Sequence, residues 1–171
     1  MNTQNAELLS AMIHYDRGDA PRIQHLVKVH GFARAIGLLE GLDADTLHVL
    51  EAAAIVHDIG IHPSLRKHGS SAGKYQELEG PPEAEILMRG VGGYTEEQIE
   101  RVKYLVGHHH TYTDIDGLDY QILVEADFLV NLHEHASEFE SAQSAYDKIF
   151  VTASGKQMLV DMFMSKTDIP Q

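Results

Sequence analysis

LHVLEAAAIVHDIG, residues 47–60, is the stretch that decides the fold of this chain. Residues 47–56 are largely apolar with helical spacing, so they predict a helix that faces a protein core. His57 and Asp58 follow where that helix is expected to end. An imidazole beside a carboxylate is half of a divalent-metal site, although the dipeptide alone is common by chance. Its meaning depends on what the rest of the chain places around it.

Helical periodicity also dominates outside this stretch, and no segment alternates like a strand, which predicts an all-α fold. Residues 62–80 are rich in glycine, serine and charge, and they are predicted to form a long loop of the kind that is usually functional. Pro81-Pro82 is expected to open the helix after that loop, and Thr95 with Gln98 predicts a capping box. The expected helices cover 5–14, 20–40, 43 or 45 to 58, 81–89, 95–110, 118–134, 138–151 and 154–164.

Composition limits the possible functions. With 171 residues the chain is expected to form one domain over 1–171 with its own core. A net charge of −13 argues against a protein that coats nucleic acid, and the absence of cysteine excludes disulfides and thiolate zinc sites. No signal peptide or membrane-spanning run is evident, so a cytoplasmic protein without membrane partners is expected. Any transition metal must be held by histidine and carboxylate groups, and the chain has 12 histidines.

Two further residues are candidates to complete the half-site at His57 and Asp58. His25 lies on an apolar stripe of its helix, and Asp127 lies on a stripe that faces the core. An uncompensated carboxylate in that position costs several kcal/mol, roughly, and a metal shared by all four residues would compensate it. Hydrogen bonds could instead satisfy each residue separately, and His30 competes with His25 for the histidine position.

Three segments together resemble the HD-domain metal-dependent phosphohydrolases: 22–33, 52–60 and 125–129. They span about 22–130 in the order found in that family. The resemblance implies a single helical HD domain, with helices over 138–164 packed on it. It also implies one divalent ion, which could be Fe, Mn, Co, Ni, Zn or possibly Mg. The ligands that it implies are His25, His57, Asp58 and Asp127.

Many members of that family hold a second metal, and the resemblance places its ligands at Glu79, His108 and His109 in this chain. Glu79 stands where the family often has histidine, so it could be a ligand or a general base. A solvated helix end is the alternative explanation of the histidines at 108–110. The family's lysine after His-Asp-Ile-Gly is missing, and Ile61 takes its place.

The function that the resemblance implies is metal-dependent hydrolysis of a small phosphorylated molecule, such as a nucleotide or dinucleotide. Asp58 and Glu79 are the expected catalytic residues, and Lys74 is a candidate for binding substrate phosphate. The alternative is a non-catalytic HD module that senses metal or nucleotide. A purely structural helical scaffold would leave Asp127 unexplained. A homodimer is possible, but no face of the sequence marks an interface.

Overall fold

A computed structural model of the chain describes residues 2–135 and 139–164. These residues form helices and contain no strand, so the all-α prediction is confirmed. The elements are α1 (Thr3–Tyr15), α2 (Ala20–Leu39), α3 (Ala44–Val56), α4 (Ile61–His68), α5 (Gly73–Val91), α6 (Glu96–Val106), α7 (Leu118–Glu134), α8 (Phe139–Lys148), α9 (Ala153–Leu159) and a terminal π-helical turn, Val160–Met164.

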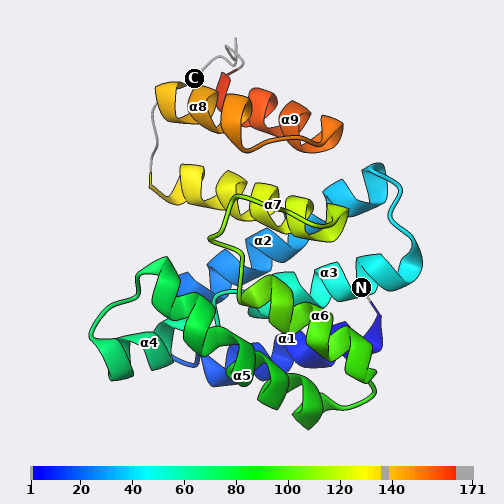
Figure 1. The fold of residues 1–171 in the computed structure, drawn as a ribbon, viewed down its shortest axis with the longest axis vertical. Helices are drawn as coiled ribbons and strands as arrows, with labels where there is room; N and C mark the ends of the chain where they lie inside the picture. The colour runs from blue at the N-terminus through cyan, green and yellow to red at the C-terminus, as the bar shows by residue number, and fades with distance from the viewer. Residues whose placement is uncertain (1, 136–138, 165–171) are drawn as a thin grey trace.

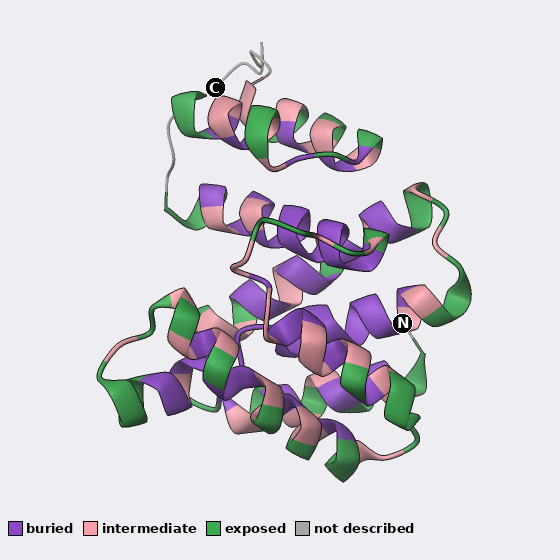
Figure 2. Cartoon of the chain, in the orientation of Figure 1, coloured by how far each residue is buried: buried purple, intermediate pink, exposed green. Residues whose placement is uncertain are grey.

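Helices α2, α3 and α7 form the centre of the molecule (Figure 1). Helix α2 packs on both α3 and α7, while α1 and α6 cover α3 and α5 packs on α1, α4 and α6. Helices α8 and α9 lie against α7 on the opposite side. Buried residues are therefore concentrated on α2, α3 and α7, as Figure 2 shows. Among the described residues, no helix has the length and apolar character to cross a membrane.

Side-chain caps define where α2, α3 and α6 begin. Asp19 accepts a hydrogen bond from the Arg22 N–H at the start of α2, and Asp43 caps α3 in the same way. Thr95 and Gln98 form the predicted capping box of α6. Helix α3 ends at Val56 with His57 as its C-cap, so the first turn after this largely buried helix carries the His-Asp pair.

The prediction of a long loop over 62–80 was wrong. This stretch contains α4 and the first turns of α5, and Pro81-Pro82 lies inside α5 rather than at its start. Proline in a helix interior normally removes a backbone hydrogen bond and disfavours the helix. Here tertiary contacts override local preference, because Gln76, Glu79 and Gly80 are buried.

Gly60 explains how closely α5 approaches the His-Asp turn. A Cβ atom at Gly60 would lie 2.6 Å from the Gln76 carbonyl oxygen and 2.8 Å from the Gly80 nitrogen. Both are backbone atoms, so they cannot move aside as a flexible side chain could. The glycine after His57-Asp58-Ile59 thus lets the backbone of α5 pack directly against the turn that carries the candidate site.

The C-terminal helices are close to their predicted positions. Helix α8 covers part of the predicted 138–151 helix, of which Glu138 lies outside the described residues. The predicted 154–164 helix begins at Ala153 and continues into a π-helical turn at Val160. Both helices contact α7, the helix that carries Asp127.

Candidate metal centre

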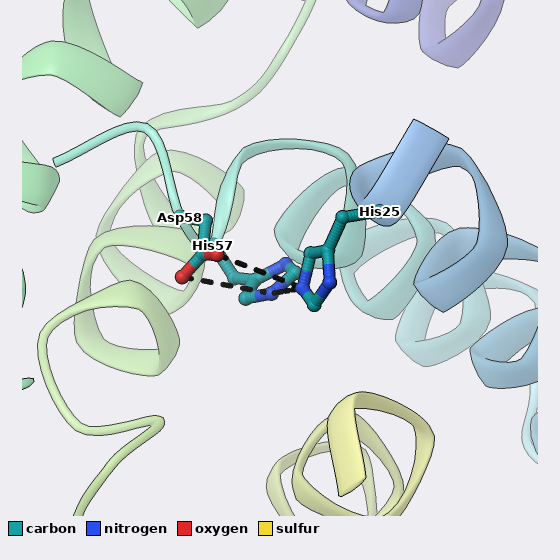
Figure 3. A group of neighbouring side chains, drawn as sticks. All are labelled: His25, His57 and Asp58. Carbon is teal, nitrogen blue, oxygen red and sulfur yellow. Dashed lines mark hydrogen bonds and ion pairs between the residues drawn. The ribbon is translucent and has the colours of Figure 1, made fainter. Parts of the chain in front are cut away.

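His25, His57 and Asp58 come together between α2 and the turn after α3 (Figure 3). One ligand atom from each of the three lies within 4.8 Å of the others. The Nε2 atoms of His25 and His57 are 3.4 Å apart, and Asp58 Oδ2 is 3.6 Å from His25 Nε2. All three residues are buried. They can therefore hold a divalent ion, because donor atoms about 2.1 Å from one ion are about 3 to 3.5 Å from each other.

Asp127 reaches the same place from α7. Its Oδ1 atom is 3.1 Å from His25 Nε2 and 3.5 Å from His57 Nε2. The Asn131 side-chain amide donates a hydrogen bond to this oxygen. The structure thus brings together the four residues predicted to share one metal. His30 is elsewhere, since its Nε2 atom faces Glu51 at 3.2 Å.

The hydrogen bonds of the imidazole rings indicate their tautomers. His57 Nδ1 lies 3.0 Å from the Ala54 carbonyl oxygen, which can only accept, so Nδ1 carries the proton. His25 Nδ1 likewise donates to Glu134 Oε2 at 2.9 Å. In a neutral ring the other nitrogen then has a free lone pair. Both Nε2 atoms face the group. Burial opposes protonation of His25, but its hydrogen bond with Asp127 and the nearby carboxylates raise its pKa, so a proton can occupy the Nε2 position that a metal ion would take.

The two carboxylates are held in their ionised form. Burial raises the pKa of Asp127, but hydrogen bonds with His25 and His57 outweigh burial, and the net pKa is lowered. Burial likewise opposes ionisation of Asp58, yet the nearby His57 and His109 rings lower its pKa well below the ordinary value. Ionised oxygens are the form that binds metal.

A second group of potential ligands shares Asp58 and consists of Asp58, His109 and His110. His109 Nδ1 donates to the Val106 carbonyl oxygen at 2.8 Å, and His109 Nε2 lies 3.3 Å from Asp58 Oδ1. The Nε2 atoms of His109 and His110 are buried and have no hydrogen-bond partner among the described residues. Burial and the neighbouring His109 lower the pKa of His110 to about 4, so its ring is neutral at pH 7.

Two of the predicted second-metal ligands do not belong to this group. His108 stacks on Tyr104 at 4.1 Å between ring centroids, and its Nδ1 atom donates to the Tyr104 carbonyl oxygen. Glu79 forms ion pairs with Lys67 and with His68, the latter at 2.8 Å, and these hydrogen bonds lower its pKa. The structure therefore places His110, which was not predicted, where His108 was expected. The α4 helix, absent from the prediction, supplies both partners of Glu79.

Lys74, the predicted phosphate-binding residue, is exposed near the start of α5. Its Nζ atom lies 4.7 Å from the centroid of the Tyr75 ring, a cation–π contact. A role for Lys74 in binding substrate stays a prediction.

Sequence reasoning missed two residues that contact the candidate ligands. Arg22 Nη1 lies 2.6 Å from Asp58 Oδ2, and Glu134 holds the His25 ring while pairing with Lys28 at 2.6 Å. Helical spacing could have found both. Arg22 precedes His25 by one turn, and Glu134 follows Asp127 by two turns, so each shares a helix face with a ligand.

A buried carboxylate outside the ligand groups lies near Asp58 and gives a pH-dependent prediction. Burial raises the pKa of Asp16 from its ordinary 3.8 to about 6, although the nearby His62 lowers it. The folded state therefore binds a proton more tightly than the unfolded chain, and stability is lost as the pH rises from about 4 through 6. Asp16→Asn should remove up to about 3 kcal/mol of this loss.

Urea unfolding of wild type and Asp16→Asn in chelator-containing buffer, at pH 4 and at pH 7.5, measures this effect. The gain in stability from Asp16→Asn should be larger at the higher pH. Asp19→Asn is the matched control, because Asp19 faces the same His62 but is one-third exposed. A stability difference between wild type and Asp16→Asn that does not change with pH would contradict the assignment.

No protein-family model, curated protein or solved structure matches this chain. The functional argument therefore depends on the geometry of the candidate metal centre and on the residues themselves.

Proposed function

We propose that this protein is a metal-dependent phosphohydrolase of the HD-domain type, acting on a small phosphorylated molecule. Its metal would be held by His25, His57, Asp58 and Asp127. Two imidazoles with two carboxylates suit Mn, Fe, Co, Ni or Zn, and no cysteine competes for a softer ion. The resemblance of the sequence to that family supports the same reading.

One observation carries the proposal. The Nδ1 protons of His25 and His57 are both used in hydrogen bonds, yet their Nε2 atoms lie 3.4 Å apart beside two ionised carboxylates. Two facing lone pairs repel each other unless a positive charge lies between them. A proton on one ring can supply that charge, and so can a metal ion. Four buried donor groups converge here from α2, from α7 and from the turn after α3. A single shared proton would need only two of them, so the arrangement favours a metal ion.

The proposed chemistry is hydrolysis by water. A divalent ion at this centre would lower the pKa of a bound water toward neutrality and polarise a phosphoryl oxygen. Arg22 holds Asp58 by its Nη1 atom, while its buried Nε atom has no partner among the described residues. A guanidinium in this position can bind a phosphate oxygen and keep Asp58 oriented at the same time. His109 faces the other Asp58 oxygen, where with His110 it could hold a second ion.

The test combines metal analysis with an activity panel. Protein purified without chelator, and protein reconstituted with Mn²⁺, Co²⁺, Fe²⁺ or Zn²⁺, would be assayed on nucleotides, dinucleotides, sugar phosphates and a simple aryl phosphate. We expect at least one ion per chain and turnover of at least one phosphate ester or anhydride. His57→Ala should lose both, whereas His30→Ala, which alters a buried histidine of α2 outside the candidate ligands, should keep both.

Two results would overturn the hydrolase. Stoichiometric metal without turnover on any substrate would favour the sensor module, particularly if nucleotide binding survives in His57→Ala. A folded protein that takes up no metal under any of these conditions would remove the central assignment.

A further inference from the structure

A histidine next to the candidate metal centre is held between two carboxylates and is not used by the chemistry proposed above. His62 lies in the first turn of α4, and its Nε2 atom is 3.4 Å from Asp16 Oδ1 and 3.4 Å from Asp19 Oδ2. An ionised carboxylate oxygen only accepts hydrogen bonds, so Nε2 is the ring nitrogen that carries a hydrogen here. The Nδ1 atom of His62 has no hydrogen-bond partner among the described residues. It is therefore free to contact a bound molecule.

His62 is connected to Asp58 in two ways. The Ile61 N–H donates to the Asp58 carbonyl oxygen at 3.1 Å, a turn that keeps the two Cα atoms within about 7 Å, and His62 is the next residue. Arg22 gives the second connection. Its backbone N–H donates to Asp19 Oδ1 at 3.1 Å, and its Nη1 atom is 2.6 Å from Asp58 Oδ2. His62 therefore lies at the edge of the candidate metal centre.

The exposure of His62 and the burial of its partner Asp16 suit a functional group better than a structural ion pair. The His62 side chain is 33% exposed, whereas the Asp58 side chain is 8% exposed, so His62 can be reached from solvent. Asp16 is buried, and its Oδ2 atom has no partner among the described residues. Because burial raises the pKa of Asp16 to about 6, an ionised Asp16 lowers the stability of the fold at neutral pH. Carboxylates perturbed in this way are concentrated at functional sites.

We propose that His62 is the general acid of the hydrolysis and that Asp16 and Asp19 hold its ring in place. This inference rests on the proposed function and adds a catalytic residue to it. A water molecule attacks phosphorus, the bond from phosphorus to the leaving oxygen breaks, and the protonated ring of His62 gives its Nδ1 proton to that oxygen. The attacking water loses a proton to solvent, and the neutral ring takes up a proton from solvent. A phosphate monoester thus gives phosphate and an alcohol, and Asp16 is a positioning residue that acts through His62.

The test compares two phosphate esters whose leaving groups differ in basicity. 4-Nitrophenyl phosphate releases a stabilised phenolate that needs no proton, whereas ribose 5-phosphate releases an alkoxide that must be protonated. The value of kcat/KM for both esters would be measured for wild type, His62→Gln and Asp16→Asn, all reconstituted with the same metal. A general acid typically contributes about 10²- to 10⁴-fold to the rate. His62→Gln should lose about this factor on the sugar phosphate and far less on the nitrophenyl ester.

Asp16→Asn should show a smaller loss with the same dependence on the leaving group. It is expected to fold, because it removes a buried charge that lowers stability. His68→Gln is the matched control, since His68 is also a partly exposed histidine of α4 with a carboxylate partner, Glu79 at 2.8 Å. The control should keep the activity of wild type on both esters. The metal content of every variant should equal that of wild type, since no candidate ligand is changed.

The outcomes separate this inference from the proposed function. An equal loss on both esters in His62→Gln would mean that His62 acts in binding or in folding, and no loss on either would mean that it has no role. Both results overturn the general acid and leave the hydrolase intact. If His62→Gln does not fold, the same comparison in Asp16→Asn decides: a loss mainly on the sugar phosphate supports the general acid, and an equal or absent loss overturns it. A wild type that turns over no phosphate ester overturns the proposed function and the general acid with it.

Discussion

Changing Asp127 to asparagine should abolish the metal binding and the hydrolysis that we propose. The carboxylate lies within 3.5 Å of both candidate imidazole ligands, and its pKa is lowered, so it supplies negative charge at neutral pH. Asparagine keeps the shape and the contact with Asn131 but has no charge. Changes to an outer partner of a metal ligand typically weaken metal affinity by about 10- to 100-fold. Asp127→Asn should weaken metal affinity by more than this. Glu134→Gln alters only the hydrogen-bond partner of His25, so it should weaken metal affinity by about this factor.

Titration with Mn²⁺ or Co²⁺, followed by calorimetry or by the absorption of Co²⁺, measures this order of effects. Asp119→Asn is the matched control, because Asp119 is also a buried carboxylate of α7 but pairs with Arg101 at 2.7 Å. Its metal affinity should remain that of wild type even if its stability falls. Unchanged metal affinity in Asp127→Asn would show that Asp127 is only a hydrogen-bonding residue of the core.

Removing the side chain of Glu125 should cause the largest loss of stability, about 3 to 5 kcal/mol. Glu125 is fully buried on α7, two residues before Asp127. It accepts hydrogen bonds from the Val151 and Thr152 backbone N–H groups, from the Thr152 hydroxyl and from the Gln121 amide. Glu125→Ala leaves these donors buried without an acceptor and releases the start of α9 from α7.

Chemical denaturation with and without metal measures this cost and separates the role of Glu125 from that of Asp127. Glu125→Ala should lower the urea midpoint strongly while any protein that remains folded still binds metal. Glu125→Gln should lose less, because its amide oxygen can still accept from the two backbone N–H groups. A loss below about 1 kcal/mol for Glu125→Ala would mean that water replaces the carboxylate and that α9 is held by its apolar contacts.

The residues of the candidate centre illustrate what local pattern can reveal. His25 and Asp127 were predicted because each lies on an apolar helix face, where a polar group needs compensation. His57 and Asp58 were predicted because they end a buried helix. Arg22 and Glu134 were within reach of the same reasoning, since each shares a helix face with a ligand. Their contacts with Asp58 and with His25 depend on how α2, α3 and α7 pack.

Residues 62–80 show where local pattern fails. Their glycine, serine and charge content predicted a loop, and the two prolines predicted a helix start, but close packing of Gly60 against Gln76 and Gly80 stabilises α4 and α5 instead. This packing also decides that Glu79 pairs with Lys67 and His68. Contacts between segments far apart in sequence leave no periodic signal, so neither result could be predicted from spacing.

By itself, then, the sequence determined the helical fold class and the four residues that meet between α2, α3 and α7. Hydrophobic periodicity and the cost of burying a charged group can both be recognised within a single helix, because they depend on residues that are near one another in sequence. Only the tertiary structure decided which of three consecutive histidines face Asp58. His108 stacks on Tyr104, while His109 and His110 join Asp58. The three histidine side chains point in different directions around the end of α6, and packing gives each of them different neighbours. The spacing of residues in the sequence does not predict either difference.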